Sequence, residues 1–338
     1  MIEEDIDESA FADAGAGAGA PPPSRPRHVF AASTARYHDL SIAVAPWAPP
    51  AAQVQTFHLP AAAAAPFAVA PAPGGGAGFV ASVDAGGSVN CAVISSLCVH
   101  SNGTHTECAG HALPGAVTLA QVAPLLCLLP ALLLSAAPQP LAAAAGGALA
   151  YPPGDAEADR VVSGALLVAA FVRLAAARAA AEAAAGEAAR GGGAAALERS
   201  RRVLRGFLRR GALVVRTLPN GAGKRSAQYG GTSPPFFTAC AMRWALARGC
   251  EHLVMDLPSA DREEDRGQLI AHRAWWGLPP AGDAAADRAA RVSARTITEL
   301  AFVEDAAGDG PYLLDLQVAP FDMDAAPSRP LLFPVREM

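Results

Sequence analysis

Apolar segments of strand type alternate with longer segments of helical type along the second half of this chain. A helical pattern covers 159–190 and stops at three glycines, and a second one covers 195–209. Strand-type segments follow at 212–217 and 252–257, with a helical pattern over 237–248 between them. This alternation with long connections predicts a single α/β domain, with a mixed β-sheet core flanked by helices.

Local composition indicates the remaining strands and the ends of the domain. Further strands are predicted at 38–44, within 78–98, and late in the chain at 313–318 and 331–335. Residues 1–30 are rich in Gly, Ala, Pro and acidic residues, which predicts a disordered tail and a domain over 31–338. We interpret the Ala-rich block at about 155–205 as a helical expansion of that domain.

Charge and hydropathy exclude two classes of partner. The net charge is −5, so the chain lacks the basic field typical of proteins that bind nucleic acid or an anionic membrane surface. The most apolar run, 122–137, is interrupted by Pro124 and Pro130 and is short for a membrane span. We expect a buried helix or a pair of strands there.

Cysteine usage and the N-terminal residues indicate a location. The six cysteines form no CxxC pair, which argues against a disulfide scaffold and against a zinc ribbon. The acidic start of the chain lacks the basic and apolar regions of a secretory signal. We therefore expect reduced thiols and a cytoplasmic protein.

A histidine cluster carries the chemistry of this sequence. His100, His105 and His111 are three of the eight histidines, and Glu107 lies between the last two. In an extended segment, residues two apart point to the same face, so His105 and Glu107 would converge. Imidazole and carboxylate together suit Zn²⁺, Mn²⁺ or a similar divalent ion. The turn at Asn102 can re-aim His100 toward the same point.

Two other catalytic classes lack their motifs. No serine lies in the strand–turn–helix context of a nucleophile elbow, which argues against a Ser-His-Asp hydrolase. The glycines at 74–76 lack the spacing of a dinucleotide or phosphate loop. Metal-activated water is the chemistry that the residues themselves favour.

Several ordered motifs resemble the cyclase / kynurenine formamidase family. Gly-Thr-His-x-Glu at 103–107 is followed by His111, which resembles the family motif His-x-Gly-Thr-His-x-Asp-x-Pro-x-His. The segment 38–41 is similar to the opening Asp-Leu-Ser strand, and 256–261 is similar to the Asp-x-Pro-Ser-x-Asp loop. His272 and Glu299 stand where the family keeps two distal metal ligands.

The resemblance implies a fold, a site and an activity. It implies the cyclase-like, swivelling β/β/α type of fold and a site that holds one or two zinc ions, with Mn²⁺ as the alternative. The implied metal ligands are His100, His105, Glu107, His272 and Glu299. It further implies His111 as the catalytic proton carrier, Trp47 beside the substrate, and a homodimer. The implied reaction is hydrolysis of N-formyl-L-kynurenine to L-kynurenine and formate, in tryptophan catabolism.

Three departures from the family motif leave alternatives open. Glu107 replaces an Asp, Ala109 replaces a Pro, and Ser101 stands at the first histidine position while His100 is one residue early. Either His100 serves as the ligand, or one metal position is vacant. The same site could open another amide, a cyclic imide or a lactone. The chain could also be an inactive relative that acts as a binding protein.

Overall fold

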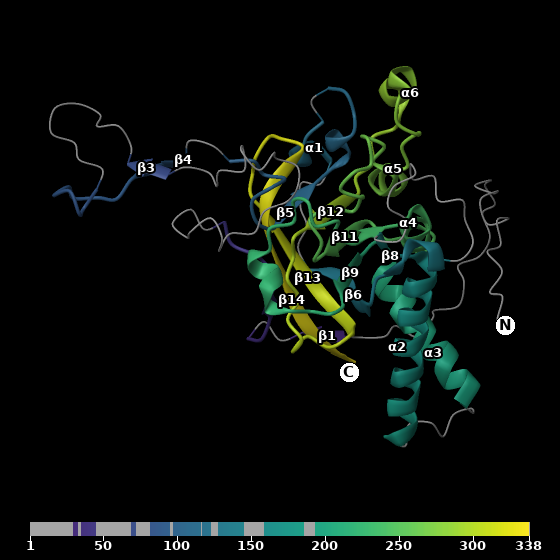
Figure 1. The fold of residues 1–338 in the computed structure, drawn as a ribbon. Coiled ribbons are helices and arrows are strands. Elements are labelled where there is room, and N and C mark those ends of the chain that lie inside the picture. The colour runs from purple at the N-terminus through teal and green to yellow at the C-terminus, as the bar shows by residue number, and fades with distance from the viewer. Residues whose placement is uncertain are drawn as a thin grey trace, which may run out of the picture.

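The structure is a computed structural model, which describes residues 30–32, 35–44, 69–71, 82–94, 97–115, 117–122, 128–144, 159–185 and 193–337. Its main sheet has nine strands in the order β1-β14-β13-β6-β9-β11-β12-β5, with β2 added beside β14. Strand β14 also pairs with β5, so the sheet closes on itself (Figure 1). The strands are β1 Phe30–Ala32, β2 His38–Asp39, β5 His105–Glu107, β6 Leu129–Ala136, β9 Ala212–Thr217, β11 His252–Met255, β12 Thr296–Glu299, β13 Gly310–Val318 and β14 Ala325–Glu337.

Strand direction is mixed, as predicted. Strands β6, β9, β11 and β12 run parallel to one another, and β13, β14 and β5 complete the sheet by antiparallel pairing. Parallel strands end at the same edge, so the C-terminal residues of β9, β11 and β12 meet there. The last residue of β12 and the first residues of the loop after β11 lie at that edge.

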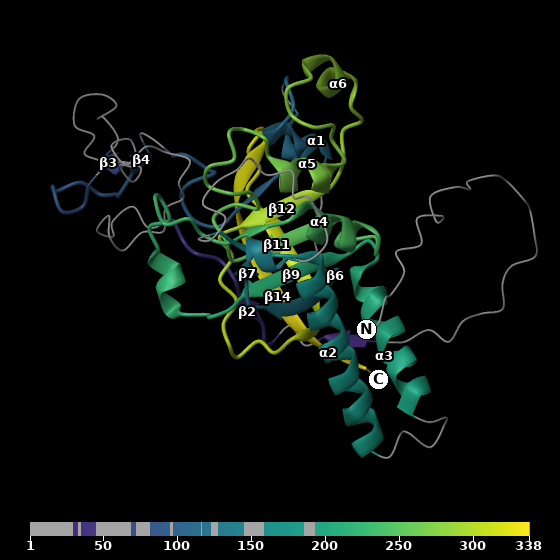
Figure 2. The ribbon, with the colours of Figure 1, turned by 45° about the vertical axis from the view of Figure 1, so that its right-hand side comes forward.

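The helices cover one side of this sheet. Helices α2 (Gly164–Ala184) and α3 (Gly193–Leu208) pack side by side, and α4 (Ala239–Leu246) lies against α2 (Figures 1 and 2). Their apolar side chains join the sheet in one core that includes Leu167, Phe171 and Phe207. Helices α1 (Leu119–Val122), α5 (Ile270–Trp276) and α6 (Ala284–Ala289) lie at the opposite end of the sheet from the free ends of α2 and α3.

Helix α2 is, within the described part of the chain, the one helix with the length and hydropathy of a membrane span. It also contacts α3, α4 and β6, as a core helix of a folded domain does. Ser163 caps its N-terminus by accepting a hydrogen bond from the Leu166 amide. The alanines of α2 favour helix strongly, which explains why this segment was predictable.

Smaller elements complete the fold. A three-stranded sheet joins β7 (Gln139–Pro140), β8 (Arg160–Val162) and β10 (Phe236–Phe237), and β3 (Val69–Pro71) pairs with β4 (Ala92–Ile94). Short 3₁₀ turns cover Ala109–His111, Leu141–Ala143 and Ala222–Ser226. The first of these turns carries a histidine of the predicted site.

Several predicted boundaries are wrong, and the differences have physical causes. Only His38–Asp39 of the predicted 38–44 strand pairs in the sheet. The Leu40 amide still donates to the Pro330 carbonyl oxygen of β14, but the next carbonyl oxygens, of Leu40 and Ile42, accept from Phe302 and Thr104, which lie outside the strands. In 78–98 the described residues before Ala92 form turns rather than a strand. The predicted 331–335 strand is much too short, since β14 bends past four partner strands. Apart from Phe30, the predicted disordered tail lies outside the described residues.

Candidate metal centre

Strands β5 and β12 place three site residues opposite one another. Antiparallel pairing sets His105 against Glu299 and Glu107 against Ile297. Because residues two apart share a face, His105 and Glu107 point to the same side of β5. His105 Nε2 lies 3.4 Å from Glu299 Oε2, and all three side chains are buried. The sequence prediction of a converging His105–Glu107 pair agrees with this geometry.

Helix α5 brings His272 into the same cluster. Its Nε2 lies 2.7 Å from Glu107 Oε1 and 3.4 Å from Glu299 Oε1. Asp261 fixes the start of this helix by accepting hydrogen bonds from the amides of Ala271 and His272. Two segments that are far apart in the sequence, 105–107 and 272–299, therefore meet at one buried point.

The two buried imidazoles each have one nitrogen held by an acceptor outside the cluster. His105 Nδ1 lies 3.2 Å from the Gly103 carbonyl oxygen, and His272 Nδ1 lies 2.7 Å from Asp261 Oδ2. A donor nitrogen on that side leaves Nε2, with its lone pair, facing Glu107 and Glu299. This is the arrangement that orients metal-ligating histidines in proteins.

Three buried polar atoms in the cluster have no hydrogen-bond partner among the described residues. They are His105 Nε2, Glu107 Oε1 and His272 Nε2. Two of them, His272 Nε2 and Glu107 Oε1, are 2.7 Å apart without forming a hydrogen bond of acceptable geometry. Buried polar atoms are nearly always satisfied, and nitrogen and carboxylate oxygen are the donors that zinc prefers. The residues fit a divalent cation held by His105, Glu107, His272 and Glu299.

A second group of imidazoles lies on the solvent side of Glu107. His100 Nδ1 is 3.1 Å and His111 Nδ1 is 3.8 Å from Glu107 Oε2, and ligand atoms of these three residues could share an ion. Asp324 Oδ2 lies 2.9 Å from His100 Nε2 and 3.5 Å from His111 Nδ1. Sequence reasoning missed Asp324, because nothing in its local sequence indicates that β14 starts beside β5.

Electrostatics keep the two glutamates ionised. Burial alone would raise the pKa of Glu107, but the charges of His111 and His272 and the hydrogen bond from His100 lower it well below its ordinary value. Burial and the charge of Glu107 would raise the pKa of Glu299, but its contacts with His105 and His272 lower it to about 2. Both glutamates are therefore available as anionic ligands at neutral pH.

The same contacts raise the pKa of two histidines of the site. Burial would lower the pKa of His272, but the charge of Glu107 and the hydrogen bond with Asp261 raise it well above its ordinary value. Burial would likewise lower the pKa of His100, but hydrogen bonds to Asp324 and Glu107 raise it to about 10. Without a cation, protonated imidazoles supply the positive charge that balances the buried carboxylates.

The family described as "Putative cyclase" matches residues 38–262, which is 225 of the 338 residues. This chain belongs to the cyclase family. The match includes His105, Glu107 and His111, together with Asp261, the partner of His272. His272, Glu299 and Asp324 lie beyond the matched range, and the fold brings them back to it.

Solved structures share this cyclase fold at low sequence identity. Isatin hydrolase A from Labrenzia aggregata, bound to benzyl benzoate, is 13% identical, with 88% of this chain and 93% of that chain covered and a TM-score of 0.50. Isatin hydrolase A from Ralstonia solanacearum is 14% identical, with 89% and 92% covered and a TM-score of 0.48. At such identity the first likeness shows the fold alone. Among curated proteins, none is significantly similar to the chain.

Two glycines give the cyclase motif its shape here. Gly103 has φ +78°, and a Cβ at this position would lie 2.8 Å from the Ile42 carbonyl oxygen. A Cβ on Gly110 would lie 2.0 Å from the Val117 carbonyl oxygen, so only glycine allows the turn that brings His111 to the site. Thr104 ties the same segment down by donating to the Leu300 carbonyl oxygen at 2.6 Å.

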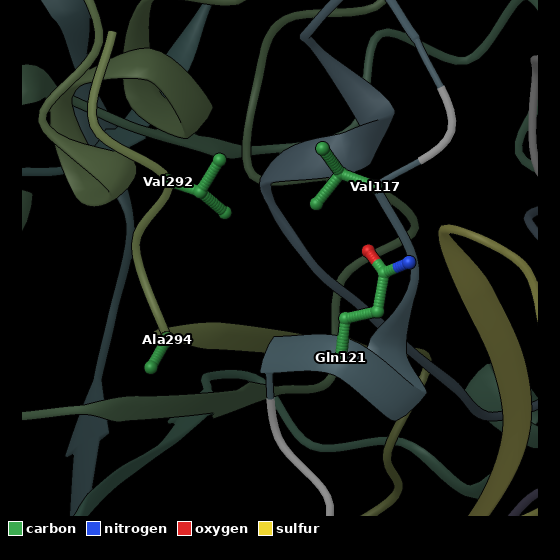
Figure 3. Close-up of a pocket in the computed structure, with 4 residues that line it drawn as sticks. All are labelled: Val117, Gln121, Val292 and Ala294. Atoms are coloured by element: carbon green, nitrogen blue, oxygen red, sulfur yellow. The ribbon is translucent and has the colours of Figure 1, made fainter.

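An aromatic wall and a shallow groove border the centre. Trp276 is buried, and its ring centroid lies 5.2 Å from that of His272 and 6.4 Å from that of His111. A groove of about 370 Å³ is lined by Val117, Gln121, Val292 and Ala294, whose side chains are drawn in Figure 3. None of these four lining residues is a histidine, a cysteine or a carboxylate, and none belongs to the cluster around Glu107, so this groove is not the candidate metal site. The predicted substrate residue Trp47 lies outside the described residues.

Proposed function

We propose that this cyclase-family protein is a metal-dependent hydrolase that cleaves a C–N amide bond. The observation that carries the proposal is that three buried atoms, on His105, Glu107 and His272, form no hydrogen bond within the described part of the chain. Leaving one such atom unsatisfied costs about 1–3 kcal/mol, so three together need a common partner. A divalent cation is the partner that two imidazole nitrogens and a carboxylate oxygen share.

The bound cation supplies the activated water, because it lowers the pKa of water toward neutrality and stabilises developing negative charge. We propose zinc as the ion, with manganese as the alternative. His105, Glu107, His272 and Glu299 would hold it. Since these four side chains are buried, water and substrate approach from the side of His100 and His111, whose side chains are 19% and 20% exposed.

His111 has the position expected of a proton carrier. Its Nδ1 lies 3.5 Å from Asp324 Oδ2 and 3.8 Å from Glu107 Oε2, so it can accept a proton at the rim of the site. Delivery of that proton to the departing nitrogen makes the amine a neutral leaving group. The exposed fraction of the ring leaves room for a substrate beside it.

The substrate we propose is N-formyl-L-kynurenine, cleaved to L-kynurenine and formate. Support comes from the ordered family motifs in the sequence and from the aromatic face of Trp276 beside the site. A cyclic amide is the second candidate, and it is favoured by the fold shared with isatin hydrolase A. Both reactions need the same attack of water on an amide carbonyl.

The test is metal content measured together with hydrolysis of N-formylkynurenine and of isatin by the purified protein. We expect stoichiometric zinc and hydrolysis of at least one of these two substrates. The variant His111→Ala should lose hydrolysis while it retains zinc at the buried position. A protein without stoichiometric metal or turnover would instead be the inactive relative. Activity that survives His111→Ala would contradict the proton-carrier role alone.

A further inference from the structure

Lys224 is the one lysine among the 26 lysine and arginine residues of the chain. Its ammonium group lies where β9 ends, and three acceptors there match its three hydrogens. Nζ is 2.6 Å from the Thr217 carbonyl oxygen, 2.9 Å from Thr217 Oγ1 and 2.7 Å from Asp256 Oδ2. A guanidinium group spreads its donors over a planar fork, so an arginine could not serve these three acceptors from a single nitrogen.

The carboxylate that Lys224 contacts is buried at the start of the loop after β11. Asp256 is 2% exposed, and it also accepts from the Thr217 amide, at 2.9 and 3.1 Å, and from the Thr217 hydroxyl, at 2.9 Å. Burial raises the pKa of Asp256, and the charge of Lys224 opposes that rise. An ionised carboxylate in the core needs such a partner. The ion pair thus extends the contact of β9 and β11 beyond their last paired residues.

The segment that carries Lys224 has its own anchors. The 3₁₀ turn Ala222–Ser226 is closed by the Lys224 amide, which donates to the Gly221 carbonyl oxygen at 3.1 Å. Before this turn, Asn220 Nδ2 donates to the Val303 carbonyl oxygen at 2.8 Å. The backbone that carries the ammonium group is therefore fixed without help from the ion pair.

The loop that begins at Asp256 ends on two of the proposed metal ligands. The Ala260 amide donates to Glu299 Oε1 at 2.8 Å, and Asp261 Oδ2 lies 2.7 Å from His272 Nδ1. One end of the loop therefore meets the lysine, and the other end holds a glutamate and a histidine of the buried cluster. Because the loop is short, a displacement of its start changes both of these contacts.

We propose that Lys224 is a positioning residue of the metal centre, and that it acts through Asp256. By fixing the start of the loop, it keeps the last two loop residues where they orient Glu299 and His272. The inference rests on the proposed function, because it assumes that the buried cluster holds a cation. Groups that orient metal ligands in this way raise the affinity for the metal.

The experiment measures zinc affinity by competition with a chromogenic chelator, on the full chain and without substrate. Lys224→Met should weaken zinc binding about 10-fold, the lower end of the range for groups that orient metal ligands. Arg216→Met is the matched control, since Arg216 is also a buried cation near the end of β9, but its side chain donates to Ala307 and Asp309 on a different loop. The control should lose stability but bind zinc as the unaltered protein does.

The variant Lys224→Arg separates positioning from compensation of charge. It keeps a positive charge beside Asp256, so its thermal midpoint, measured with excess chelator, should stay close to that of the unaltered protein. Its zinc affinity should still fall toward that of Lys224→Met, because the planar fork cannot reproduce the three contacts.

Two further measurements report on the ligands and on the route of the effect. The visible absorption of Co²⁺ bound in place of zinc depends on ligand geometry, so its bands should shift in Lys224→Met and not in Arg216→Met. Lys224→Met combined with Asp256→Asn should bind zinc no more weakly than the weaker single variant, because the lysine acts through that carboxylate.

Several results would overturn the inference and leave the proposed function intact. They are equal zinc affinities of Lys224→Met and Arg216→Met in a protein that binds zinc, full affinity of Lys224→Arg, and additive losses in the double variant. If Lys224→Met does not fold, the comparison of Lys224→Arg with Arg216→Met decides in the same way. An unaltered protein that binds no zinc would overturn the inference and the proposed function together.

Discussion

The two halves of the candidate centre use the same kind of residue pair in different surroundings. In the buried half, Asp261 and His272 are 3% and 1% exposed, and two backbone amides also hold Asp261. In the outer half, the side chains of Asp324 and His100 are 29% and 19% exposed. The inner pair is thus preorganised by the protein, whereas the outer pair stays in contact with solvent.

This difference assigns different tasks to the two halves. A carboxylate inside the core interacts strongly with its partner, because little water screens the pair. The outer pair is screened more, but water and substrate can reach it. We expect the inner half to retain a cation tightly, and the outer half to be the place where protons and substrate exchange.

The largest effect is expected at Glu107, which contacts both halves. Glu107→Gln removes the charge that faces His272 and His100, so the buried half can no longer hold a cation as before. Loss of metal chemistry costs several kcal/mol in the transition state, and hydrolysis should fall at least ~10³-fold. Metal analysis and kcat/KM on the same preparation check this. Full zinc content in the variant would show that Glu107 is not a ligand.

The second-largest effect on zinc affinity is expected at Asp261, the carboxylate of the inner pair. Asp261→Asn should weaken zinc binding about 10–100-fold and should lower the free energy of unfolding by about 1–3 kcal/mol. Asp265→Asn is the control, since Asp265 also accepts backbone hydrogen bonds, from Gly267 and Leu269. The control should lose stability but keep its zinc affinity. Equal zinc affinities in the two variants would show that Asp261 stabilises the loop but does not orient His272 for metal binding.

His252 is a buried histidine whose ring contacts a threonine instead of a carboxylate, so it serves as a reference for His272 and His100. Burial lowers the pKa of His252 to about 4, and its Nδ1 lies 2.9 Å from Thr296 Oγ1. The folded ring stays neutral while the unfolded ring gains a proton below about pH 6.5, so its contribution is full above that pH and is lost as pH falls toward about 4. From about pH 6.5 to about pH 5.5 the loss is about 1 kcal/mol. Urea unfolding should show this slope, and His252→Gln should flatten it. An unchanged slope would contradict the assignment.

The smallest effect is expected in the helix pair formed by α2 and α3. Glu182 lies near the end of α2 that points away from α5 (Figure 1), 3.2 Å from Arg178 Nε. Glu182→Gln should change the free energy of unfolding by less than ~0.5 kcal/mol, because an ion pair between residues four apart on one helix contributes about 0.2–0.5 kcal/mol. Zinc affinity should not change. A loss of zinc from this variant would show that the helix pair supports the centre.

Sequence reasoning predicted elements whose signal is local. The strand Ala212–Thr217 was predicted with its observed bounds, and the helices α2, α3 and α4 were predicted with ends displaced by a few residues. Terminal turns depend on neighbouring segments as well as on propensity, so helix ends carry the largest error. The long strand β14 was mostly missed, because its pairing partners come from four separate parts of the chain.

By itself, the sequence determined that His105 and Glu107 share a face, since a two-residue period is a property of any extended chain. It also determined the turns that only glycine allows and the helix that the alanine-rich segment favours. Only the tertiary structure decided that His272 and Glu299 meet that pair and that Asp324 reaches His100. The physical reason is that closure of the sheet by β14 and β5 depends on packing of the whole core. No local period encodes the distance between segments that far apart.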